Sequence, residues 1–360
     1  MRGAGAVTTA ADIGAAQVLP IQTAVAPLRA RSRGDRAVGS AAEVARSRRE
    51  PRQLSVRTDD GVTLHLTVHG PRGAPCTVVF LHGLCLSQVS WALQIDSVVD
   101  SFGPMVQAVC YDHRGHGRSM AAASDSYTID RLADDLNTVL HAVAPTGSVV
   151  VIGHSMGAMA ALTHCARHAS PDTRRVDGLV LAATAAGHLT RFGLGQLLTA
   201  PGVSTLLRLL QSAPGPTLQP LRRLLAGPVC RGVSHWHGSR SGCALAAVAA
   251  DALATTSLRT AVGFLPALAL FDQYSTLGSI RAKTVVISGG ADLLTPAVLA
   301  EDIAARIPGS RHLHLPHCGH MVQQAREELD AAIAAVITDV IAEGQRLVSA
   351  PSPRLAEARA

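Results

Sequence analysis

Apolar and polar residues follow two different periods along this chain, and both begin near residue 54. The stretches LSVRT (54–58) and VTLHLTVHG (62–70) alternate apolar and polar positions on either side of the glycine turn DDG. A period of two around a glycine turn predicts an antiparallel hairpin. The runs CTVVFLHG (76–83) and MVQAVCYDHRG (105–115) are continuously apolar and end in loops, which is typical of strands buried on both faces.

Between such runs, apolar residues three and four positions apart predict helices. In TIDRLADDLNTVLHAV (128–143), Ile129, Leu132, Leu136 and Leu140 share one helical face, and Thr128 is a suitable N-cap. The other predicted elements are helix 89–99, strand 148–153, helix 156–168, strand 176–184, strand 284–289, helix 297–306, strand 311–315 and helix 321–344. Strands alternating with helices favour an α/β fold with a mainly parallel sheet covered on both faces, to which the hairpin adds an antiparallel edge.

One interval interrupts this alternation. Residues 188–282 are rich in Leu, Ala and Arg with helix-like stretches, and they are far too long for an ordinary connection between two core strands. We therefore predict a helical cap at 188–282, inserted into a core made of 53–187 and 283–345. The flanking segments 1–52 and 346–360 lack such periodicity and are predicted to be disordered tails, the first of them basic.

Charge and composition narrow the class of protein. The formal net charge is +6, but residues 1–50 carry eight Arg against four acidic residues and so contribute +4. The predicted core is thus nearly neutral, and no nucleic-acid partner is expected. The longest apolar run is broken by two charged residues and a proline, so no stable membrane insertion is predicted. Seven scattered cysteines and the lack of a secretory signal favour reduced thiols and a cytoplasmic location.

The stretch VVVIGHSMGAMAAL (149–162) places a serine on an abrupt corner between a predicted strand and a predicted helix. Gly153-His154-Ser155-Met156-Gly157 matches the pattern G-x-S-x-G in the context that gives this pattern meaning. The two glycines are explained if side chains at their positions would collide with the neighbouring strand and helix. A hydroxyl displayed at a helix N-terminus is well placed for developing negative charge, so Ser155 is the predicted nucleophile.

An activated serine needs a histidine base and an acid that orients it. Asp292 follows the strand TVVISGG, and His320 lies in the loop PHCGHM after the strand RHLHL. Both follow the carboxyl ends of predicted parallel strands, as Ser155 does, and open α/β sheets place their sites at this edge. His317 lies further from the next helix and Asp302 falls inside a helix. Asp292 and His320 are therefore preferred.

The reaction also needs two N–H donors for the oxyanion. The first candidate is the backbone N–H of Met156, directly after the serine. The second comes from the loop LHGLCLSQ (81–88), where His82-Gly83 allows a close approach of the backbone. Leu84 N–H is the preferred donor there, with Cys85 N–H as the alternative. No metal is expected, because His164 and His168 lack a third ligand.

Five ordered motifs, FLHG, YDHRGHGRS, GHSMG, GGADLLTP and HCGH, resemble the α/β-hydrolase fold superfamily, in particular its capped esterase, lipase and cofactor-free haloperoxidase-like members. The resemblance implies an eight-stranded sheet, hydrolysis through an acyl-serine intermediate and no cofactor. It also implies that Asp112 and Arg114 brace the site without reacting. Epoxide hydrolases and haloalkane dehalogenases carry Asp at the nucleophile position, so Ser155 argues against both.

These observations favour a serine hydrolase that cleaves a carboxylic ester, and the apolar cap favours a small hydrophobic or acyl substrate. The same triad could serve hydrolysis of a carbon–carbon bond, a thioester or a lactone, or perhydrolysis, because the cap pocket chooses the substrate. A non-catalytic ligand sensor is disfavoured, since binding alone does not need all three groups. The oligomeric state is left open by the sequence.

Overall fold

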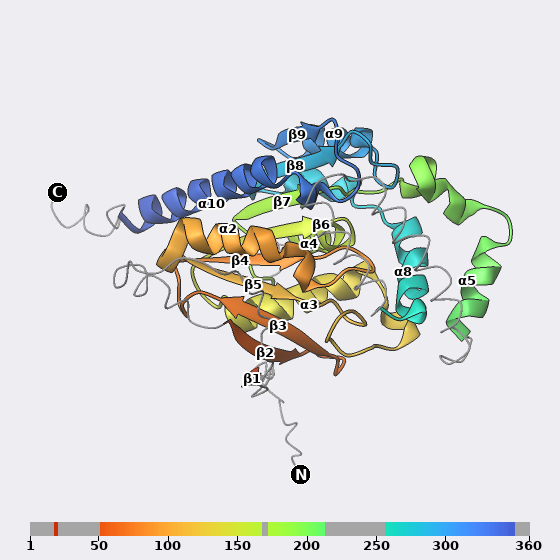
Figure 1. Cartoon of the computed structure of the whole chain (residues 1–360), viewed down its shortest axis with the longest axis horizontal. Coiled ribbons are helices and arrows are strands. Elements are labelled where there is room, and N and C mark those ends of the chain that lie inside the picture. The colour runs from red at the N-terminus through yellow and green to blue at the C-terminus, as the bar shows by residue number, and fades with distance from the viewer. Residues whose placement is uncertain (1–17, 21–50, 168–171, 213–255, 350–360) are drawn as a thin grey trace, which may run out of the picture.

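The fold is built around one mixed β-sheet (Figure 1). The structure is a computed structural model, and it describes residues 18–20, 51–167, 172–212 and 256–349. Among these residues the strand order is β1-β2-β3-β5-β4-β6-β7-β8-β9. The strands are β1 (Val18–Pro20), β2 (Arg52–Arg57), β3 (Thr63–His69), β4 (Cys76–Leu81), β5 (Val106–Tyr111), β6 (Ser148–His154), β7 (Gly178–Ala182), β8 (Lys283–Gly289) and β9 (Arg311–Leu315).

The pairing of the strands confirms the predicted sheet. β2 and β3 form the antiparallel hairpin, and β3 pairs antiparallel with β5. From β5 through β4, β6, β7 and β8 to β9, every neighbouring pair is parallel. Strands β2 to β9 are thus the eight predicted strands. The short β1, which falls within the segment predicted to be a tail, pairs antiparallel with β2 at the edge.

Helices cover both faces of the sheet, because its central strands are apolar on both sides. In β4, Val79 and Leu81 face one core cluster, whereas Val78 and Phe80 face the other. α2 and α10 pack on the second face, and α3, α4 and α9 cover the first (Figure 1). These helices are α2 (Ala92–Phe102), α3 (Ile129–Val143), α4 (Met156–Ala166), α9 (Ala297–Arg306) and α10 (Arg326–Ser349).

Helix boundaries differ slightly from the prediction. Thr128 caps α3 as expected, and its side chain accepts a hydrogen bond from Arg131 N–H at 3.1 Å. The final helix lies about five residues later than predicted, since α10 spans Arg326–Ser349 where 321–344 was expected, and residues 346–349 of the predicted second tail are therefore helical. Arg346 lies in its last turn, where a cation interacts favourably with the helix dipole, and its Nε donates to Ala342 O.

The predicted cap contributes helices beside the sheet. Its described elements are the 3-10 helices η4 (Leu189–Arg191) and η5 (Gly193–Thr199) and the helices α5 (Val203–Ser212) and α8 (Leu258–Leu270). α5 and α8 stand next to each other at one end of the molecule (Figure 1). Gly187 and Asp272 form a bridge at the base of the insertion, and η6 (Tyr274–Ser279) after it packs on the core. Predicted cap residues 213–255 lie outside the described residues, as do most of 1–52 and residues 350–360.

Candidate active site

Ser155 stands on the sharp corner between β6 and α4. Its backbone has φ 52° and ψ −117°, a positive φ that is uncommon for a residue other than glycine. Four hydrogen bonds hold this conformation. In the first, Ser155 N–H donates to Ala182 O at 2.9 Å. The Ser155 carbonyl accepts the other three, from Ala158 N–H, Met159 N–H and Thr184 Oγ1. The surrounding structure thus keeps the serine in a strained, displayed position.

Close packing explains the two glycines that flank this serine. A Cβ on Gly157 would lie 2.6 Å from Leu81 O and 2.7 Å from His82 O, at the end of β4. A Cβ on Gly153 would lie 2.5 Å from Ala158 Cα in the following helix. Collisions with the neighbouring strand and with the helix, expected from the sequence, are therefore present at both positions.

Ser155, His320 and Asp292 form one continuous hydrogen-bonded series. His320 Nε2 lies 3.0 Å from Ser155 Oγ, and His320 Nδ1 lies 2.8 Å from Asp292 Oδ2. The three side chains come from the loops after β6, β8 and β9, at the carboxyl edge of the sheet. The Asp292 side chain is fully buried and that of His320 is 19% exposed. His317 is exposed, and Asp302 pairs with Arg306 on α9, so neither joins this series.

The Asp292 carboxylate is fully provided with donors. Leu294 N–H and Thr295 N–H donate to Oδ1 at 2.8 and 2.9 Å, and Thr295 Oγ1 donates to Oδ2 at 2.6 Å. Burial alone would raise the pKa of Asp292, but the hydrogen bonds from His320 and Thr295 outweigh it and the pKa is lowered. Asp292 is therefore a carboxylate that can accept the Nδ1–H of His320 and fix its tautomer.

Two backbone N–H groups near the serine have no acceptor among the residues that the structure describes. Among the hydrogen bonds of the described residues, none uses the N–H of Leu84 or of Met156. Met156 is the first residue of α4, where helix geometry provides no intrahelical acceptor. Cys85 N–H, the alternative donor, is occupied by His116 Nε2 at 3.2 Å. This difference favours Leu84 over Cys85.

His82 fixes the peptide that carries the Leu84 N–H. Its Nε2 accepts from His113 N–H at 2.9 Å, so its Nδ1 carries the proton and donates to Gly83 O at 2.8 Å. Burial lowers the pKa of His82 to about 4, which keeps the ring neutral. Gly83 C=O and Leu84 N–H belong to one planar peptide. The bond from His82 therefore sets the direction of the Leu84 N–H.

His154 connects the serine corner to the histidine loop. It is fully buried, and its Nε2 donates to the backbone carbonyl of His320 at 2.9 Å. Burial and the neighbouring His320 lower the pKa of His154 to about 3. Gly83 leaves room for this ring, because a Cβ there would lie 2.7 Å from His154 Nδ1 and 3.3 Å from Ser155 Cβ.

Asp112 and Arg114, both buried after β5, serve different parts of the structure. Asp112 accepts from Gln88 N–H at 2.8 Å and Gln88 Nε2 at 2.9 Å, and so anchors the loop that contains Leu84. Arg114 instead forms a bidentate ion pair with Asp135 on α3 and a second pair with Asp60 in the hairpin turn. Asp112 thus holds the loop that carries Leu84, whereas Arg114 joins the hairpin to α3.

The sequence-based reasoning missed four polar residues that hold these groups: Thr295, Gln88, His116 and Asp135. Thr295 could have been recognised, because a hydroxyl three residues after an Asp and directly before a helix is a common local hydrogen-bonding arrangement. The other three act across sequence separations of 21 to 31 residues. No local pattern indicates such partners.

An apolar cluster begins at Met156, the residue that follows the serine. It combines Met156 and Met159 of α4 with Leu189 and Phe264 of the predicted cap, and Leu84 packs against it. This cluster therefore starts at the residue after Ser155 and joins the core to the predicted cap.

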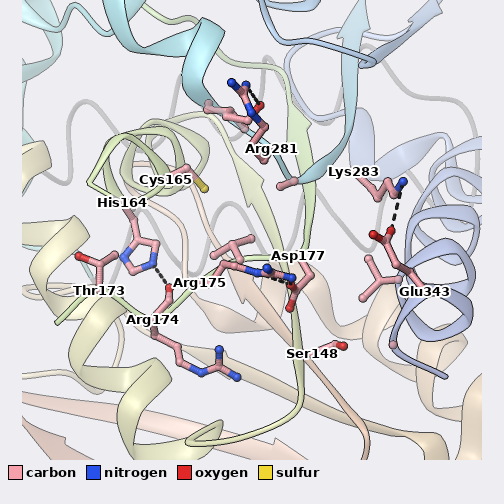
Figure 2. A pocket seen from close by; sticks show the side chains of 15 residues that line it. Ser148, His164, Cys165, Thr173, Arg174, Arg175, Asp177, Arg281, Lys283 and Glu343 are labelled. Carbon is pink, nitrogen blue, oxygen red and sulfur yellow. Dashed lines mark hydrogen bonds and ion pairs between the residues drawn. The ribbon is translucent and has the colours of Figure 1, made fainter. Parts of the chain in front are cut away.

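A separate pocket of about 410 Å³ lies at the other edge of the sheet (Figure 2). Ser148, Asp177 and Lys283 line it, at or beside the first residues of β6, β7 and β8. Two ion pairs lie in it, Arg175 with Asp177 and Lys283 with Glu343 (Figure 2). This pocket is therefore separate from the Ser155 site.

Neither a metal centre nor a membrane span is found in the part of the chain that the structure describes. No group of three or more His, Cys, Asp or Glu side chains there could hold a metal ion. His164 is buried and bonds the backbone carbonyl of Arg174, while His168 lies outside the described residues. None of the described helices is both long enough and apolar enough to cross a membrane.

Comparison with known proteins identifies the class. A family profile described as alpha/beta hydrolase fold matches residues 77–324, and the chain belongs to this family. It is 28% identical over 260 residues to "Putative carbamate hydrolase RutD" of Variovorax paradoxus, covering 71% of this chain and 89% of that protein.

Solved structures show the same fold. The esterase EaEST of Exiguobacterium antarcticum superposes with a TM-score of 0.61 at 21% identity, over 79% of this chain and 98% of that one. The enol-lactonase of Burkholderia xenovorans gives 0.60 at 22% identity, over 77% and 97%. The superfamily resemblance drawn from the motifs is thereby confirmed, and the chain is a hydrolase by family and relatives.

Proposed function

We propose that this chain is a serine hydrolase that cleaves carboxylic esters whose acyl part is apolar. The observation that carries the proposal is the hydrogen-bonded series from Ser155 Oγ through His320 to Asp292, with distances of 3.0 and 2.8 Å. Two N–H groups without an acceptor among the described residues, those of Leu84 in the loop after β4 and of Met156 at the start of α4, lie near that serine. Nucleophile, base, orienting acid and oxyanion donors are the parts that acyl transfer requires.

In the proposed acylation, Ser155 Oγ attacks the ester carbonyl carbon while His320 Nε2 takes the hydroxyl proton. Asp292 accepts the Nδ1–H of His320 and stabilises the imidazolium that forms. The carbonyl oxygen becomes an oxyanion that accepts hydrogen bonds from the N–H groups of Leu84 and Met156. Collapse of this intermediate breaks the bond to the alkoxy group, which leaves as an alcohol with the proton from His320.

In the proposed deacylation, water replaces the alcohol. His320 Nε2 takes a proton from the water as its oxygen attacks the acyl-serine carbonyl, and the same two N–H groups accommodate the second oxyanion. The bond to Ser155 Oγ then breaks, the serine recovers its proton from His320, and the carboxylic acid departs.

The apolar surroundings support the choice of substrate. The apolar cluster that begins at Met156 also contains Leu189 and Phe264, and Leu84 packs against it. Apolar side chains next to the nucleophile would bind an apolar group by removing it from water. The relatives are named for carbamate, lactone and ester hydrolysis. The same triad could hydrolyse carbamates, lactones, thioesters or carbon–carbon bonds, or could catalyse perhydrolysis. These are the alternative reactions.

A fluorophosphonate probe tests the proposed nucleophile. The wild type and Ser101→Ala, which changes an exposed serine on α2, should be labelled equally, and Ser155→Ala should not be labelled. The kcat of Ser155→Ala should fall by roughly 10⁶-fold. Equal labelling of Ser155→Ala would refute the proposal.

A substrate panel tests the proposed class. We expect the highest kcat/KM for p-nitrophenyl esters with medium-length acyl chains, compared with matched thioesters, lactones, carbamates and diketones. Turnover of lactones or carbamates without turnover of esters would replace the proposed class with one of the alternatives.

A further inference from the structure

We propose that His116 is a positioning residue, which holds the loop carrying the Leu84 N–H and ties this loop to cap helix α8. The inference rests on the proposed function, because it assigns Leu84 N–H to the oxyanion. His116 itself does not bond Ser155, His320 or Asp292. It acts on the reaction through the backbone of Cys85.

The loop after β4 needs support because it is strained next to the donor. Cys85 has φ 57°, in the left-handed region that disfavours residues with a Cβ. Its N–H points to His116 Nε2 at 3.2 Å. The preceding peptide is held separately, by the bond from His82 Nδ1 to Gly83 O. The Leu84 residue is therefore fixed on both sides by a histidine.

His116 is suited to accept this hydrogen bond. Its Nδ1 donates to Arg114 O at 3.1 Å, which leaves Nε2 without a proton and free to accept from Cys85 N–H. The ring is fully buried, and burial together with the nearby His82 lowers the pKa of His116 to about 3. The imidazole consequently stays a neutral acceptor at neutral pH.

The same ring touches the cap. The centroids of His116 and Phe264, which lies on α8, are 5.9 Å apart. In the neighbouring residue, a Cβ on Gly115 would lie 2.6 Å from Thr260 Cγ2 and 2.9 Å from Tyr127 Oη. Helix α8, which contains Thr260, therefore packs directly against the loop after β5 that contains His116. A displacement of α8 would therefore move His116, and with it the acceptor of the Cys85 N–H.

Two substitutions separate the hydrogen bond from the packing. His116→Phe keeps an aromatic ring against Phe264 but removes the acceptor. His116→Gln places Oε1 where Nε2 lies and keeps the acceptor. The matched control is His164→Phe, because His164 is also buried and also bonds a backbone carbonyl, that of Arg174 at 2.7 Å, but lines the pocket at the other edge of the sheet.

We expect kcat of His116→Phe to fall about 10- to 100-fold, less than the loss of a whole oxyanion donor, with KM changed less than about threefold. His116→Gln should keep at least about a third of the wild-type kcat, and His164→Phe should match the wild type. Wild-type kcat in His116→Phe, or an equal loss in His116→Gln, would overturn the inference.

Amide hydrogen exchange of the peptide covering residues 82–91 gives a readout that does not depend on turnover. His116→Phe should speed exchange at Cys85 by at least about tenfold, and His116→Gln and His164→Phe should not. Unchanged exchange in His116→Phe would overturn the inference even if the esters are cleaved. If no ester is cleaved by the wild type but this exchange pattern is found, the proposed reaction fails and the link between His116 and the loop stands.

Discussion

Mild acid should destabilise this fold strongly, because three histidines around the site are buried in neutral form. His82, His116 and His154 are at most 1% exposed, and burial lowers their pKa values to about 4, 3 and 3. In the folded protein these rings share backbone hydrogen bonds and remain uncharged. In the unfolded chain they take the ordinary value of 6.5.

The magnitude follows from linkage between protonation and folding. Because each folded pKa is depressed, the unfolded chain binds protons first as the pH falls. The stability is complete above about pH 6.5 and is lost progressively as the pH falls to about 4 for His82 and to about 3 for His116 and His154. At pH 5 each histidine lowers the free energy of unfolding by about 2 kcal/mol, and the three together lower it by about 6 kcal/mol. This loss is comparable with the whole free energy of unfolding of an ordinary domain.

Urea unfolding followed by intrinsic fluorescence between pH 7.5 and pH 5.5 measures the effect. As the pH falls through the lower half of this range, the free energy of unfolding should fall with a slope of at least about three protons per molecule, since His113 is also fully buried with a lowered pKa and adds to the three. His154→Phe removes one of the three groups and should reduce the slope by about one proton, whatever its effect at pH 7.5. Ser101→Ala, at an exposed position on α2 that does not titrate, should leave the slope unchanged.

A free energy of unfolding that is constant between pH 7.5 and pH 5.5 would refute the reasoning. So would an unchanged slope in His154→Phe, since the proton uptake would then come from other groups.

Three further outcomes test the site and its support. Asp292→Asn should lower kcat by about 10⁴-fold because the base loses its orienting acceptor, and activity within tenfold of the wild type would contradict this. Gly157→Ala places a Cβ 2.6 Å from Leu81 O, so the free energy of unfolding in urea should fall by about 1–3 kcal/mol. Asp135→Asn leaves the buried Arg114 with a weaker partner and should lower the free energy of unfolding by about 3–5 kcal/mol in the same assay, with little change in the kcat of the folded protein. A large loss of kcat without loss of stability would contradict the structural role of Arg114.

Much of the fold could be predicted because its signals are local. The period of two predicts the β2–β3 hairpin, and the apolar runs predict strands buried on both faces. Thr128 predicted the start of α3, where its side chain does accept the capping bond. The end of the last helix was placed too early, because weak periodicity near a chain end resembles a tail, whereas α10 continues to Ser349.

The arrangement of the site was also within reach of the sequence. Ser155, Asp292 and His320 each follow the end of a parallel strand, and such ends meet at one edge of the sheet. The structure brings them within 3.0 Å of their partners. The role of Arg114 was out of reach, because it depends on Asp60 and Asp135, which reach the arginine only through the packing of the hairpin and α3.

By itself, the sequence determined that Ser155 stands on a tight corner between a strand and a helix, because glycine placement and hydrophobic period act over a few residues. The order in which Asp292 and His320 follow it is likewise written in the chain. Only the tertiary structure decided that Leu84 N–H is left without an acceptor while Cys85 N–H is bound by His116. It also decided that His82, His116 and His154 are neutral, because burial and hydrogen-bond partners arise when loops from different strands meet.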